Sequence, residues 1–227
     1  MTLPYPLLLL LTLAVAALDW FAVARAWRRI EYVAKPAVML LLFIWLYLAT
    51  GLGGAMLYFG LGLLFSMLGD LFLLFNGQGW FLAGLGAFVL AQLCYVVGFN
   101  LTPPGTNLFS IITAILVAVL ASRIYRRLVA GLVASGQARL RMPVLAYTLV
   151  ISLMLVSALL TLYRPGWLGL PSLMAAAGAA LFFTSDTLLG WKLFIRPLKQ
   201  GDLLIIISYH LGQLLLITGV ALNHLYA

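Results

Sequence analysis

Long apolar runs recur along the whole chain, and they restrict the folds open to it more than any other feature does. Hydrophobic residues make up 65% of the 227 residues, and charged residues only 8%. Soluble domains carry about 25% charged residues, so a water-soluble core would not absorb this much apolar surface. The runs are also too long and too continuous for the alternating strands of a membrane β-barrel. The pattern therefore predicts an all-α, polytopic membrane protein with a single transmembrane domain over residues 1–227.

Eight of these runs approach the ~20 residues that cross a hydrocarbon core. They cover about residues 4–23, 36–50, 52–75, 80–99, 108–122, 142–163, 170–194 and 203–226. Turn signals such as "NGQG" and "NLTPPGTN" separate them. The second and fifth runs are short, so seven or nine spans remain alternatives from length alone.

The basic residues favour eight spans. Twelve of the thirteen Lys and Arg side chains would lie on one side of the membrane: Arg25, Arg28, Arg29, Lys35, Arg123, Arg126, Arg127, Arg139, Arg141, Lys192, Arg196 and Lys199. Only Arg164 would lie on the other side. The positive-inside rule then places both termini outside the cytoplasm. The net charge of +8 needs no nucleic-acid partner, and it suits anionic membrane lipids. The basic segment around residues 123–141 is a candidate for a short amphipathic helix on the membrane surface.

The two halves of the chain resemble each other. Spans three and four place Asp70 before Gln92, and spans seven and eight place Asp186 before Gln213. The partners are four spans apart, so both copies have the same orientation. This spacing is consistent with a parallel 4+4 repeat.

Asp70 and Asp186 are the strongest chemical signal, because each lies in an apolar span ("FSMLGDLFLLF" and "FFTSDTLLGWKLF"). At 1.5 Å per residue, Asp70 lies ~7 Å and Asp186 ~12 Å inside the cytoplasmic helix ends. A carboxylate at that depth costs at least ~2.5 kcal/mol, so it needs a partner or a function. We therefore expect both to face the bundle interior as catalytic groups.

Other polar side chains at helical spacing extend this layer into a candidate pocket. We expect Ser66, Gln92, Tyr95, Ser185, Tyr209, His210 and Gln213 to contact the substrate, and Asp19 lies at a similar depth. The alternative is that these groups only join helices by hydrogen bonds. That alternative is weakest for the two aspartates, since helix association rarely needs charge.

The residue inventory argues against other chemistries. The chain has two His residues, and a zinc hydrolase needs about three His or carboxylate ligands. Neither a nucleophile elbow, nor a phosphate-binding loop, nor a haem attachment motif is present. We therefore expect neither a metal nor a cofactor.

The segments "KPAVMLLL", "FSMLGDLFLL", "GLGAFVLAQLCYVVGF", "FFTSDTLLG" and "SYHLGQLLLITG" resemble the YhhN family of membrane proteins, the lysoplasmalogenases. The resemblance implies eight helices and hydrolysis of the vinyl ether bond of lysoplasmalogens to a fatty aldehyde and a glycerophospho-base. It also implies that Asp70 and Asp186 are the family's paired aspartates, and it suggests a location in a bacterial inner membrane. The family often has His where this chain has Gln92, and His210 does not match a family position.

Vinyl ether hydrolysis needs one general acid and one base or charge stabiliser, which two carboxylates can supply without a metal. We expect Asp186 to be the acid because it is the deeper and the better desolvated of the two. Lys35 would bind the phosphate of a lysophospholipid, one or two turns above the carboxylates. The alternatives are a transporter with a carboxylate proton relay and a non-catalytic membrane protein.

Overall fold

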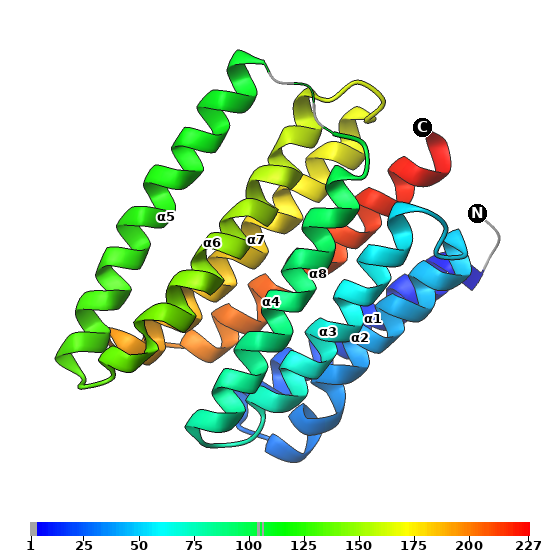
Figure 1. Ribbon diagram of the computed structural model, residues 1–227. Coiled ribbons are helices and arrows are strands. Elements are labelled where there is room, and N and C mark those ends of the chain that lie inside the picture. The colour runs from blue at the N-terminus through cyan, green and yellow to red at the C-terminus, as the bar shows by residue number, and fades with distance from the viewer. Residues whose placement is uncertain (1–3, 104, 106) are drawn as a thin grey trace.

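A computed structural model describes residues 4–103, 105 and 107–227 (Figure 1). In that part of the chain, eight α-helices are long and apolar enough to cross a membrane. They are α1 (Pro4–Ala24), α2 (Arg28–Thr50), α3 (Ala55–Leu73), α4 (Gln78–Asn100), α5 (Leu108–Ala134), α6 (Arg141–Leu160), α7 (Gly169–Phe194) and α8 (Gly201–Tyr226). The prediction of an eight-helix membrane protein is confirmed.

Local signals explain several helix boundaries. Gly51 ends α2 in the left-handed conformation, with φ of 63°, where its N–H donates to the Tyr47 carbonyl. Asn107 begins α5 with a reciprocal capping arrangement, in which its side chain accepts from the Ser110 N–H. Pro171 lies in the first turn of α7, where its missing N–H has no helical partner in any case.

Two predicted boundaries are wrong. Helix α2 begins at Arg28, so Lys35 and Pro36 lie about two turns inside it and not at its start. The residues that precede Pro36 are mostly good helix formers, and the proline removes only one backbone hydrogen bond. Helix α5 continues to Ala134. Residues 123–134 of the basic segment are therefore part of this long helix and do not form a separate surface helix. Long arginine side chains let an apolar helix continue because their charged ends can reach the polar membrane surface.

The bundle has two chemically different ends. Both termini lie at one end, as Figure 1 shows by the blue and red ends of the ribbon. The turns after α1, α3, α5 and α7 lie at the other end, which carries most of the arginine and lysine side chains. We call this the basic end. The assignment of the basic end to the cytoplasm stays a prediction, and so does the 4+4 repeat.

Among the described residues, α7 and α8 form the most extensive helix–helix contact. A Cβ atom on Gly212 would lie 2.8 Å from the Phe182 backbone nitrogen and 2.9 Å from the Gly178 carbonyl oxygen. Backbones can approach this closely only where side chains are absent. Helix α8 also packs against α1, α2 and α3, so it joins the two halves of the bundle.

Helix α5 lies at the edge of the bundle (Figure 1) and packs mainly against α6 and to a smaller extent against α7. Its outer face exposes large apolar side chains such as Leu116, which is 64% exposed. In a membrane protein such a face contacts lipid tails, so its exposure needs no protein partner.

Candidate active site

Asp70 and Asp186 line the same cavity near the basic end. The cavity has a volume of about 390 Å³, and we call it the polar cavity. Asp70 comes from the last turn of α3 and Asp186 from the second half of α7. Its lining includes Lys35, and its mouth carries charged side chains of both signs: Arg28, Glu31, Lys192 and Asp202. The sequence therefore correctly predicted that two carboxylates from distant spans share one space.

Asp70 has a cation and a phenol as partners. The Lys35 ammonium lies 3.4 Å from Oδ1, and the Tyr209 hydroxyl donates to Oδ2 over 2.8 Å. Asp70 is only 1% exposed. An opposite charge and a hydrogen-bond donor both favour the ionised form of a carboxylate. The ammonium of Lys35 thus lies within the carboxylate layer and not above it, because α2 begins earlier than predicted.

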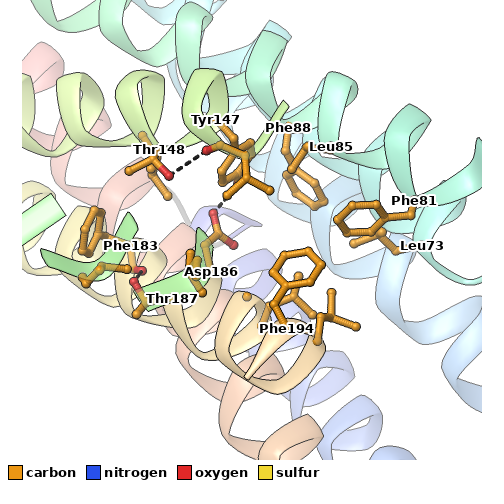
Figure 2. Close-up of a pocket in the computed structure, with 17 residues that line it drawn as sticks. Leu73, Phe81, Leu85, Phe88, Tyr147, Thr148, Phe183, Asp186, Thr187 and Phe194 are labelled. Carbon is orange, nitrogen blue, oxygen red and sulfur yellow. Dashed lines mark hydrogen bonds between the residues drawn. The ribbon is translucent and has the colours of Figure 1, made fainter. Parts of the chain in front are cut away.

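Asp186 has a phenol but no cation. Its Oδ2 accepts a hydrogen bond from the Tyr147 hydroxyl of α6 (Figure 2). The ion pairs found in the described part of the chain are Lys35–Asp70 and Lys192–Asp202, and neither includes Asp186. Asp186 is half-buried, whereas Asp70 is almost fully buried. The expectation that Asp186 is the better shielded of the two is therefore wrong: its side chain faces open cavity space.

Tyr147 is a site residue that the sequence reasoning missed. It lies six residues into α6, which places it ~9 Å from the basic end of that helix, at a depth similar to that of Asp186. A tyrosine in an apolar span is common, and its depth was the one signal that pointed to it. Only the packing of α6 against α7 brings its hydroxyl to the carboxylate.

A second hydrogen-bonded group lies farther from the basic end. Tyr95 donates to the Gln213 side-chain oxygen over 2.8 Å, and the Gln213 amide donates to the Ser66 hydroxyl over 3.0 Å. All three side chains are fully buried and are absent from the polar cavity's lining. Their observed contacts join α3, α4 and α8, so a direct role in substrate binding stays a prediction.

The remaining predicted residues lie in different settings. Ser185 lines the polar cavity, but its hydroxyl donates to the Ile205 carbonyl of α8. The Gln92 amide is buried and has no hydrogen-bond partner among the described residues. His210 is buried as well, and its Nδ1 accepts from the Trp20 indole over 3.2 Å. Asp19 is fully buried, and neither of its oxygens has a hydrogen-bond partner in the described structure.

An apolar groove meets the polar cavity at Asp186 (Figure 2). Side chains of α4 to α7, together with Leu73 of α3, form its walls, and it encloses about 70 Å³. Phe81 and Phe88 of α4 line both spaces. One carboxylate therefore lies at the boundary between a charged space and an apolar one, which suits an amphiphilic substrate.

The residue types offer acid–base chemistry more readily than metal binding. In the described residues, no group of three or more His, Cys, Asp or Glu side chains is placed to hold a metal ion. The cavity instead offers a carboxylate that can carry a proton and a second one whose negative charge is stabilised. Such a pair is suited to protonating a substrate and stabilising the cation that results.

Comparison with known proteins is consistent with these features. The sequence profile of the YhhN family matches residues 30–220. Lysoplasmalogenase TMEM86B of Homo sapiens is 32% identical over 181 residues, which are 80% of this chain and 70% of that protein. Lysoplasmalogenase TMEM86A of Bos taurus is 29% identical over 181 residues, 76% of this chain and 71% of that protein. A lysoplasmalogenase of Mycobacterium tuberculosis is 30% identical over 167 residues, 69% of this chain and 58% of that protein. No solved structure matches the chain.

Proposed function

The chain belongs to the YhhN family and is a membrane-embedded hydrolase, and we propose that it cleaves the vinyl ether bond of lysoplasmalogen-type lysolipids. One observation carries this proposal: two carboxylates with different partners face one cavity that has a charged mouth and an apolar extension. The names of the relatives support the same substrate class.

The proposed reaction begins with proton transfer from Asp186 to the β-carbon of the vinyl ether. This transfer leaves an oxocarbenium ion, in which the adjacent carbon shares its positive charge with the ether oxygen. Water adds to that carbon and loses a proton, and the resulting hemiacetal separates into a fatty aldehyde and a glycerophospho-base. The net change is the addition of one water molecule.

The partners of Asp186 suit the role of the acid. The Tyr147 hydroxyl donates to Oδ2, so Oδ1 is the oxygen available to carry a proton toward the substrate. Asp186 has no ion-pair partner in the described structure, and it borders the apolar groove. A carboxyl group in such a setting is more readily kept protonated than one beside an ammonium group. Its half-buried side chain can reach a bound lipid.

The partners of Asp70 suit the role of the anion. Lys35 and Tyr209 stabilise its negative charge. The ionised carboxylate can then stabilise the oxocarbenium ion and accept the proton of the attacking water. The reaction cycle closes when that proton returns to Asp186, for which the shared cavity offers space for water.

The charged mouth of the polar cavity is suited to the head group. Arg28 and Lys192 can attract a phosphate, and Glu31 and Asp202 can attract a positively charged base. Lys192 forms an ion pair with Asp202, so a zwitterionic head group would replace one charge pair by another. In this proposal, the glycerol backbone lies between the mouth and the carboxylates.

The test is mass spectrometry of purified protein that has been incubated with matched alkenyl and acyl lysolipids. We expect free fatty aldehyde from the alkenyl lipid and no fatty acid from the acyl lipid. Absence of aldehyde in detergent and in liposomes would contradict the proposal. Movement of intact lipid across liposomes without product would favour a transporter instead.

A further inference from the structure

The apolar groove is well placed to hold part of a lipid chain. It begins at Asp186 and is bounded by α4, α5, α6 and α7, and Leu73 of α3 also lines it. Apart from Asp186, the polar groups in its lining are Tyr147, Thr148 and Thr187. The Thr148 hydroxyl donates to the Val144 carbonyl and the Thr187 hydroxyl to the Phe183 carbonyl, so neither threonine needs a polar ligand.

We propose that this groove holds the first few carbons of the lysolipid's single alkenyl chain, while the rest of the chain leaves the protein between α4 and α5 and lies in the bilayer. The identity of the ligand rests on the proposed function, whereas the position of the chain rests on the groove.

The length of the groove limits how much of the chain it can enclose. Ile151 lies one turn after Tyr147 on α6, and Phe183 lies three residues before Asp186 on α7. Both positions are within ~6 Å of the carboxylate layer along the helix axes. The groove therefore extends only about one helical turn from the reacting carbons toward the middle of the bundle.

The alkenyl chain can leave the groove on the side toward α5. Helix α5 packs against α6 and α7, and its residues Ile124 and Leu128 face α4 across the groove. Leu193, which lines the same groove, is 44% exposed. A long chain can thus lie partly against the protein and partly among lipid tails.

This arrangement predicts how activity depends on chain length. Carbons beyond the groove lie among lipid tails whether or not the lysolipid is bound, so they add little to the free energy of binding. The groove then acts by holding the reacting carbons beside Asp186. Once the chain is long enough to fill the groove, additional carbons should leave KM nearly unchanged.

Gly190 keeps the groove open beside Asp186. It lies four residues after Asp186, and therefore on the same face of α7. A Cβ atom at this position would lie 3.3 Å from the methyl carbons of Leu128 on α5. A larger side chain here would have to occupy the groove or push Leu128 aside.

The first experiment replaces Gly190 by Leu. We expect KM for a hexadecenyl lysolipid to rise by about tenfold or more, because the leucine side chain would overpack the space that the first chain carbons occupy. Gly86→Leu on α4 is the matched control, since a Cβ at Gly86 meets no atom within 4 Å. Adding Leu128→Ala to Gly190→Leu should restore much of the affinity. An unchanged KM in a folded Gly190→Leu variant would overturn the proposal.

The second experiment uses the unmodified protein and does not depend on hydrolysis. The probe is a lysolipid with a saturated alkyl ether chain that carries a photoreactive diazirine near the ether oxygen. We expect labelling within residues 144–151 and 183–190. Labelling confined to the outer faces of α1 or α5 would overturn the proposed chain position. If the groove is labelled but alkenyl lipids release no aldehyde, only the proposed function is contradicted. If aldehyde is released but the label lies elsewhere, only the proposed position of the chain in the groove is contradicted.

Discussion

At the scale of single residues, the chemistry depends on two aspartates whose surroundings differ. Lys35 and Tyr209 both stabilise the charge of Asp70, whereas Asp186 has Tyr147 alone. Two carboxyl groups of one cavity take separate acid and base roles when their environments differ in this way. The contacts support the proposed assignment of Asp186 as the acid and Asp70 as the anion.

We predict that Asp70→Asn and Asp186→Asn each lower aldehyde release by at least about 100-fold. Asn is nearly isosteric and can keep a hydrogen bond, but it neither donates an acidic proton nor carries negative charge. The rate is measured by mass spectrometry, and thermal unfolding in detergent checks that each variant is folded. Variants that keep more than about a tenth of the wild-type rate would mean that the aspartates only hold helices together.

We predict that Tyr147→Phe lowers kcat by about tenfold and leaves KM nearly unchanged, because a hydrogen bond to a charged or reacting group contributes about 1.5–3 kcal/mol. Tyr147 acts as a positioning residue through Asp186, so the split between kcat and KM is the informative measurement. Tyr125→Phe is the matched control, since Tyr125 donates to the Arg141 carbonyl and lies outside the polar cavity. A similar loss of kcat in both variants would contradict the special role of Tyr147.

At the scale of helices, glycines decide how closely α7 and α8 approach. Gly178 and Gly212 face backbone atoms of the opposite helix, so neither neighbour can move aside as a side chain would. Asp186 and Tyr209 come from these two helices, and their positions depend on this contact. Helix packing and site geometry are therefore coupled here.

Replacing Gly212 by Val should lower the free energy of unfolding by about 1–3 kcal/mol or more, since about 1–3 kcal/mol is the usual cost of overpacking. The reason is the 2.8 Å approach of a new Cβ to the Phe182 nitrogen. Thermal unfolding in one detergent measures the effect, and Gly86→Val serves as the control in open space. Equal melting temperatures for the two variants would refute the close packing of α7 on α8.

At the scale of the whole molecule, the described part of the chain has an even number of long helices, so both termini lie at one end of the bundle (Figure 1). The opposite end is the basic end. The polar cavity and its charged mouth lie near the basic end. A lysolipid would therefore reach the aspartates from the membrane leaflet on that side.

We predict that the basic end faces the cytoplasm and that both termini lie outside it, because basic loops are retained on the cytoplasmic side. Single cysteines at Ser135 and at Ala227, in a Cys94→Ala background, report the two ends with a membrane-impermeant maleimide. In intact cells, Ala227→Cys should react and Ser135→Cys should react only after lysis. The reverse pattern would overturn the orientation.

The sequence by itself determined the helices and the depth of the main polar groups. Apolar run lengths and turn signals identified the eight membrane-spanning helices of the described residues, although the start of α2 and the end of α5 were placed wrongly. The insertion cost of a buried carboxylate singled out Asp70 and Asp186. These properties depend on the position along one helix, and the order of the residues encodes that position directly.

Only the tertiary structure decided which polar groups meet. Helices that are apolar on all sides carry little periodic signal of which face turns toward which neighbour. Three features therefore could not be derived from residue spacing. Asp186 pairs with Tyr147, the Lys35 ammonium reaches Asp70, and Gln213 lies outside the polar cavity. Each depends on the rotation and lateral packing of helices that are distant in the sequence.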